Sequence, residues 1–221
     1  LVPCVLAAFI AQGISSALGL ESTHFVVDEI ASFSLINGSK FIIMSILFAL
    51  ASILLCVVLH GTSKLYTDYI NNPYIRIFGT TDYLGAGSDI IARSFVTSCA
   101  WYVFLLKMLF TAVTLGGGFK GGEIVPTLFV GATLGSFLAP IFGLPVGLCA
   151  ACGMVSVFCG VTNCPLTSFI LSIEMFGAST MKFTLLCIAL SYLLSGYYSL
   201  YNSPKIVYSK YKTEYINRRS H

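Results

Sequence analysis

The sequence is poor in charged residues. Only 10% of its 221 residues are Asp, Glu, Lys or Arg, whereas an ordinary soluble domain has roughly a quarter. Hydrophobic residues make up 57% of the chain, and its mean hydropathy is +0.89. A water-soluble fold of this size needs a charged surface to stay dispersed. The composition therefore excludes a soluble globule and predicts a protein that lies in a lipid bilayer.

An excess of either charge is also lacking. The formal net charge is +3, which is too small a bias to indicate nucleic-acid binding. Its distribution is uneven, because five of the twelve cations lie in the tail formed by residues 202–221. Basic segments flanking a membrane span tend to stay in the cytoplasm. The sequence thus predicts a multi-pass protein of the cell membrane with a cytoplasmic basic C-terminal tail.

Clusters of catalytic or metal-ligating side chains are missing from the apolar region. Cys149-Ala-Ala-Cys152 has a metal-ligand or redox spacing, but no His, Asp or Glu lies between Val125 and Ile173 to complete a site. The eight cysteines all occur in apolar surroundings, which favours buried free thiols. No pair of a nucleophile and a base stands out either. We expect no metal, no cofactor and no enzymatic activity.

The chain contains instead a series of apolar stretches. Several approach the roughly 20 residues that a helix needs to cross a bilayer, whereas 146–161 and 166–176 are shorter and predict partial spans. Prolines at the stretch edges are typical of helix starts and stops. We therefore expect a single all-α, multi-pass membrane domain over residues 1–221, built of tilted and partial-span helices. The stretches are Leu1–Leu18, Phe41–Leu59, Phe95–Leu115, Ile124–Phe142, Val146–Val161, Leu166–Phe176 and Phe183–Tyr198.

The most informative segment is the glycine-rich run over residues 116–122. It contains the pattern G-x-G-x-x-G, but an apolar helix-length stretch precedes it and the first acid after Glu123 is Glu174, so a dinucleotide site is excluded. The run leads into a predicted helix at 124–142, whose first backbone N–H groups are unpaired at the positive end of the helix dipole. Such an end is suited to an anion. A glycine turn that serves close packing is the alternative interpretation.

Glu123 lies directly before this helix. Its carboxylate either is stabilised there by the helix dipole or competes with a bound anion for the same amides and carries a proton, since ionisable groups at membrane depth are often functional. Lys120 is expected to be a loop charge. Tyr208 is, by composition alone, one of several tyrosines that could lie at a membrane interface.

Three motifs, in this order, resemble the C-terminal half of the CLC family of chloride channels and halide/proton antiporters. Gly122-Glu123-Ile124-Val125-Pro126 resembles the G-x-F-x-P element that opens the anion-coordinating helix of that family. The segment 159–175, with Asn163-Cys164-Pro165, resembles the start of a short helix at the family's dimer interface. Lys205-Ile206-Val207-Tyr208-Ser209 resembles the start of the last family helix.

The resemblance implies a halide site formed by the backbone at Gly122, Glu123 and Ile124 and by the hydroxyl of Tyr208, with a possible proton or gating role for Glu123. It also implies a homodimer formed through helices 1–18, 166–176 and 183–198. Gly-Phe-Lys-Gly-Gly-Glu before the helix resembles the bacterial branch that includes fluoride/proton antiporters, so both chloride and fluoride are candidate substrates. The expected function is halide transport, by a voltage-gated chloride channel or an anion/proton antiporter.

Some family features have no counterpart. Ile124 replaces the usual Phe. The first half of the family fold, with its gating glutamate, is not found, and neither is a helix that relatives place near residues 76–80. We therefore expect the second inverted repeat only, with one helix deleted. The alternative interpretation is a truncated nonfunctional remnant, or a structural membrane subunit that requires a separate N-terminal half.

Overall fold

The computed structural model describes residues 2–19, 24–69, 87–118, 121–201, 205–212 and 214–219. Within them, helices account for most of the chain and a small antiparallel hairpin follows the last helix. The expected helix deletion near residues 76–80 lies outside the described residues. The elements are α1 (Val2–Ala17), α2 (Leu35–Tyr69), α3 (Ser88–Val96), α4 (Val103–Gly116), α5 (Ile124–Phe142), α6 (Val146–Thr162), α7 (Pro165–Phe176), η1 (Ala178–Thr180), α8 (Met181–Leu194), β1 (Lys205–Tyr208) and β2 (Tyr215–Arg219).

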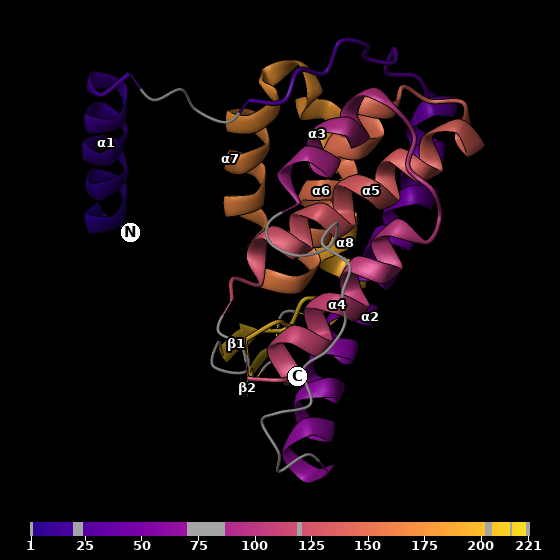
Figure 1. Ribbon diagram of the computed structural model, residues 1–221. Coiled ribbons are helices and arrows are strands. Elements are labelled where there is room, and N and C mark those ends of the chain that lie inside the picture. The colour runs from indigo at the N-terminus through magenta and orange to yellow at the C-terminus, as the bar shows by residue number, and fades with distance from the viewer. Residues whose placement is uncertain are drawn as a thin grey trace.

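The bundle is organised around α5 and α6. These two helices pack against each other along their length, and α2, α3, α4, α7 and α8 surround them (Figure 1). Every residue of α6 from Leu148 to Val161 is buried. By contrast, α1 stands apart from the other helices (Figure 1). Among the described helices, Leu35–Lys64 and Ile124–Phe142 are long and apolar enough to cross a membrane, and several shorter helices are also apolar.

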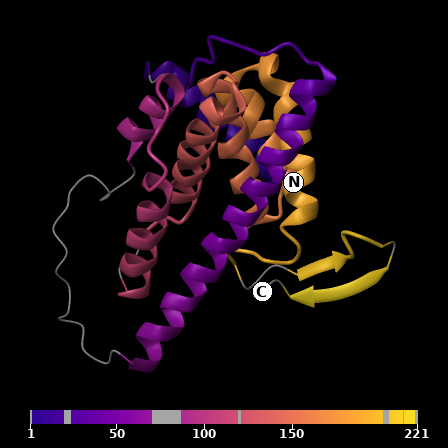
Figure 2. The same ribbon diagram turned by 90° about the vertical axis from the view of Figure 1, so that its right-hand side faces the viewer.

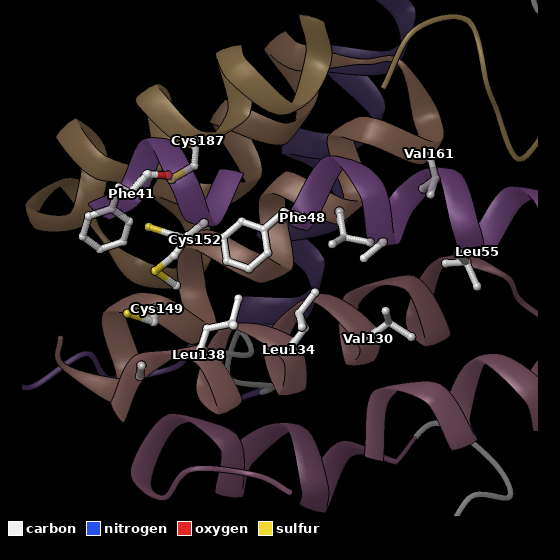
Figure 3. Packing of buried hydrophobic residues seen from close by; sticks show 14 of the residues in the cluster. Phe41, Phe48, Leu55, Val130, Leu134, Leu138, Cys149, Cys152, Val161 and Cys187 are labelled. Atoms are coloured by element: carbon white, nitrogen blue, oxygen red, sulfur yellow. The ribbon is translucent and has the colours of Figure 1, made fainter. Parts of the chain in front are cut away.

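The core is a continuous apolar layer where α2, α5, α6 and α8 meet. Phe41 and Phe48 of α2 point towards the thiols of Cys152 on α6 and Cys187 on α8 (Figure 3). Leu134 and Leu138 of α5 close the other side of this layer. Burial of this kind supplies the main stabilisation available between packed helices, and it fixes α5 at the centre of the molecule.

Most helix boundaries agree with the punctuation of the sequence. The helix α5 covers the predicted range Ile124–Phe142, and α7 begins at Pro165 as predicted. The helix α2 is longer than the predicted stretch and begins at Leu35, because the Ser34 hydroxyl accepts a hydrogen bond from the backbone N–H of Asn37 (3.3 Å) and caps the helix. The stretch 95–115 is divided between α3 and α4.

The segment 205–209 does not form the helix start that the family resemblance implies. It contributes strand β1, which pairs with β2 in an antiparallel hairpin, with Lys205 opposite Arg219 and Tyr208 opposite Tyr215. Figure 2 shows the hairpin projecting from the lower end of the helical bundle. Neighbouring β-branched and aromatic residues favour extended backbone, and a short isolated helix carries a high nucleation cost. The helical fold class is unaffected, since the hairpin lies after the last helix.

Candidate functional site

The N-terminus of α5 is an open helix end. Gly121 and Gly122 are exposed before it, and Glu123 is its half-buried N-cap residue. The backbone N–H groups of Ile124 and Val125 have no acceptor one turn earlier in the helix, and none is found for them in the described part of the chain. Pro126, the third residue of the helix, has no N–H and is buried. The helix therefore presents a small group of free amides at its positive end.

Glu123 is anchored by its backbone. Its carbonyl oxygen accepts hydrogen bonds from the backbone N–H of Thr127 (3.3 Å) and from the Thr127 hydroxyl (2.8 Å). On the other side, a Cβ added to Gly121 would lie 3.6 Å from Leu115 at the end of α4. Gly121 thus leaves room for ordinary van der Waals contact with the end of α4.

The Glu123 carboxylate faces the long helix α2. His60 and Cys56, both on α2, lie within electrostatic range of it. The His60 ring is held by its Nδ1, which lies 2.9 Å from the carbonyl oxygen of Cys56. His60 is thus a functional candidate beside Glu123. The sequence did not single it out, because the hydrophobic pattern of α2 does not show that this helix passes the N-terminus of α5.

The remaining predicted site residues are placed only in part. Ile124 is exposed, so its side chain is not part of the core. Lys120 lies outside the described residues. The backbone of Tyr208 lies in β1, opposite Tyr215, whereas its side chain is not among the described ones. A contact of Tyr208 with the α5 N-terminus therefore stays a prediction.

The segment directly after Tyr208 is bound to the end of α8. The Ser209 and Tyr197 hydroxyls are 3.0 Å apart, and the Tyr211 hydroxyl donates to the carbonyl oxygen of Leu193 (2.6 Å). Between them, the Lys210 ammonium donates to the Tyr192 carbonyl oxygen (2.8 Å). The backbone that carries Tyr208 is thereby joined to the helical bundle.

Thiols and metal-ligating groups form no further site in the described parts of the chain. No set of three or more His, Cys, Asp or Glu side chains could hold a metal ion there. Cys149 and Cys152 are free and buried in the core, as are Cys56, Cys159 and Cys187. Two other cysteines depart from the predicted burial, since Cys99 is half-buried and Cys164 is exposed.

A family described as voltage gated chloride channel matches residues 1–196. The chain belongs to this family. The predicted family and its helical membrane fold are confirmed, although the matched region ends before Tyr208.

Individual relatives agree with the family assignment. The chain is 33% identical, over 96% of its length, to a chloride/fluoride channel protein from Pseudomonas syringae pv. tomato, of which it covers 51%. A voltage-gated ClC-type chloride channel from Salmonella typhimurium is 35% identical over 34% of the chain and 20% of the relative. A solved structure of a CLC-type fluoride/proton antiporter matches with a TM-score of 0.84 and 30% identity, over 91% of this chain and 54% of the other. The chain spans about half the length of the Pseudomonas syringae relative and of the solved antiporter.

Proposed function

We propose that the protein containing this chain transports halide anions across the cell membrane. The observation that carries the proposal is the open N-terminus of α5, where free amides lie next to the half-buried Glu123. Backbone amides at a helix start can replace part of the water shell of an anion without a full positive charge. Binding by such partial positive charges is favourable enough for an anion to enter the site and weak enough for it to leave.

The site joins an anion-binding group to a proton-binding group. When ionised, the Glu123 carboxylate competes with a halide for the positive helix end, and when protonated it no longer does. His60 on α2 lies within electrostatic range of Glu123. This arrangement supports an anion/proton antiporter over a passive channel within the family.

Both chloride and fluoride are proposed as substrates. The relative from Pseudomonas syringae is named a chloride/fluoride channel protein, and the matching solved structure is titled a fluoride/proton antiporter. Fluoride is the smaller halide and the stronger hydrogen-bond acceptor, but it is also the most costly to dehydrate, so its binding requires donors in addition to the α5 amides. We propose fluoride as the preferred ion and Tyr208 as a further hydrogen-bond donor to it.

A homodimer with a cytoplasmic C-terminal tail completes the proposal. Large apolar side chains stay exposed on α1, for example Phe9 (68%) and Ile10 (62%), and on α7, for example Leu166 (67%) and Ile170 (57%). Exposed apolar faces of this extent suit either lipid or a second copy of the chain. The basic residues of the tail support the cytoplasmic orientation.

The proposal is tested with the full-length protein that contains this chain, purified and reconstituted into liposomes. Chloride- and fluoride-selective electrodes measure halide efflux, and a pH electrode measures coupled proton movement. We expect efflux from the wild type, and loss of proton coupling with at least a tenfold change in efflux in Glu123→Gln. Glu174→Gln, at an exposed position on α7, is the matched control and should behave as wild type.

The alternative, a remnant or a structural subunit, gives a different result in the same assay. A folded full-length protein that releases neither chloride nor fluoride would overturn the transport proposal. Efflux that is indifferent to Glu123 would retain transport but remove the α5 N-terminus as its site.

A further inference from the structure

We propose that Lys210 is a positioning residue, which holds the Tyr208-bearing segment in place by joining it to the C-terminal ends of α6 and α8. The inference rests on the proposed function for its role in transport, whereas the positioning itself can be measured independently. Lys210 follows Tyr208 by two residues, and its side chain extends away from the hairpin into the end of the helical bundle.

The ammonium of Lys210 meets three acceptors from two helices. It donates to the side-chain oxygen of Asn163, which ends α6, and to the Tyr192 carbonyl oxygen in the last turn of α8 (2.8 Å). Its third contact is the hydroxyl of Ser195, the C-cap residue of α8 (3.4 Å). An ammonium has three N–H donors, so this geometry uses all of them.

The location explains why a cation is suited to this position. The last carbonyl groups of a helix have no intrahelical partner and carry the negative end of its dipole. Here the ends of α6 and α8 are brought together, and one positive charge faces both. The ring of Tyr192 adds a face for the cation, with Nζ 4.1 Å from its centroid.

The hairpin itself needs such an attachment. An isolated two-stranded sheet is at best marginally stable in water, and β1 pairs only with β2 among the described residues. Ser209 and Tyr211 assist Lys210 by their contacts with Tyr197 and Leu193. Of the three residues after Tyr208, Lys210 and Tyr211 thus contact α8, Ser209 contacts the turn that follows α8, and Lys210 also reaches the end of α6.

A half-buried ammonium is better suited to positioning than to stabilisation. The free-energy cost of removing a charge from water offsets much of the favourable energy of its new contacts. A ligand group in a binding site must, however, be held within about 0.5 Å to be effective. We therefore expect that loss of the Lys210 charge affects the placement of Tyr208 more than the overall stability of the protein.

The first test measures placement directly. Hydrogen–deuterium exchange is followed in the full-length protein over residues 205–215, where the Ser209 amide donates to the Glu214 carbonyl oxygen (3.0 Å). We expect Lys210→Met to speed this exchange at least tenfold without altering exchange in α5 and α6. Lys212→Met, an exposed lysine two residues further, is the matched control and should leave it unchanged. Unchanged exchange in Lys210→Met overturns the inference, whatever the protein transports.

The second test asks whether Lys210 acts through Tyr208. In liposomes, we expect Lys210→Met and Tyr208→Phe each to lower the maximal halide efflux about tenfold, and the double variant to be no slower than Tyr208→Phe. Lys210→Arg should restore at least half of the wild-type rate, because a guanidinium is also a cation that can donate to both helix ends and stack on Tyr192.

The possible results separate this inference from the proposed function. If the reductions in efflux rate multiply in the double variant, positioning through Tyr208 is overturned. A residue that acts only through Tyr208 has no further effect on the rate once the Tyr208 hydroxyl is removed. If the wild type carries no halide but Lys210→Met speeds exchange, the proposed function fails and the positioning role of Lys210 stands.

Discussion

Gly131 on α5 and Gly153 on α6 lie in direct backbone contact. A Cβ added to Gly131 would lie 2.7 Å from the Cα of Met154 and 2.8 Å from the carbonyl carbon of Gly153. A Cβ added to Gly153 would meet Gly131 in return, and would lie 3.1 Å from the Phe48 ring. No side chain fits between the two helices at this crossing, so the position of α5 depends on both glycines.

Substitution of Gly131 by Ala should separate α5 from α6. Alanine is intrinsically the better helix former by about 1 kcal/mol, yet here its methyl group must displace backbone atoms, and overpacking typically costs about 1–3 kcal/mol. We expect a net loss of stability in Gly131→Ala, seen as a lower midpoint of thermal unfolding in detergent. Gly38→Ala is the control, because no atom lies within 4 Å of its added Cβ. Equal midpoints for the two variants would contradict the contact.

The glycine contact illustrates how much the sequence could predict. A G-x-x-x-G spacing is typical of closely packed helices, and Gly135, four residues after Gly131, does meet α6, where an added Cβ would lie 2.7 Å from the carbonyl carbon of Cys149. Gly143 and Gly147 have the same spacing, but Gly143 serves to end a helix and does not contact a neighbouring one. Gly143 ends α5 with a φ of 60° and faces open space. A spacing shows that close approach is allowed, but not which neighbour approaches.

The candidate site was predictable on the same terms. The glycine run and Pro126 located the start of α5 because they act through local backbone geometry. The proximity of His60 to Glu123 was not predictable, since it depends on how α2 crosses the start of a helix more than sixty residues later. The hairpin at 205–219 was missed for a different reason: the family resemblance implied a helix start at 205–209, whereas the β-branched and aromatic residues there favour extended backbone.

His60 is expected to influence the protonation of Glu123. Opposite charges favour each other's ionised form, and the charges of these two residues interact between α2 and the α5 N-terminus. Replacing His60 by Gln should therefore shift the pH dependence of halide efflux to higher pH, because Glu123 then takes up its proton more readily. The pH profile of efflux from liposomes measures the shift. In a Glu123→Gln background the same replacement should have no effect, and a shift there would assign it to another group.

Asn163 should be sensitive to substitution in a specific order. It ends α6 in the left-handed conformation with a φ of 56°, and its amide nitrogen donates to the Tyr198 carbonyl oxygen (2.7 Å) while its oxygen accepts from Lys210. Asn163→Gly keeps the backbone conformation but loses both bonds, at a cost of about 1–3 kcal/mol. Asn163→Ala adds the strain of the left-handed region, about 1–2 kcal/mol. Unfolding midpoints should fall from wild type to Gly to Ala, and a more stable Ala variant would be inconsistent with this cap.

Lys210 should make the stability of the protein depend on pH in the alkaline range. Burial lowers its pKa from 10.5 to about 8. Between about pH 8 and 10.5 the unfolded chain still holds the lysine proton, whereas the folded chain has released it. Unfolding in this range takes up a proton, so the free energy of unfolding contributed by Lys210 rises with pH.

The comparison with Lys210→Met isolates this effect from the titration of other lysines and tyrosines. Unfolding midpoints of both proteins are measured in detergent from pH 7 to pH 10. We expect the wild type to gain stability relative to Lys210→Met above about pH 8 and the difference to be constant below it, since both states of the wild type are then protonated. If the difference in unfolding midpoint between the two proteins is constant from pH 7 to pH 10, the Lys210 ammonium stays hydrated in the folded protein, and the two helix ends do not enclose it.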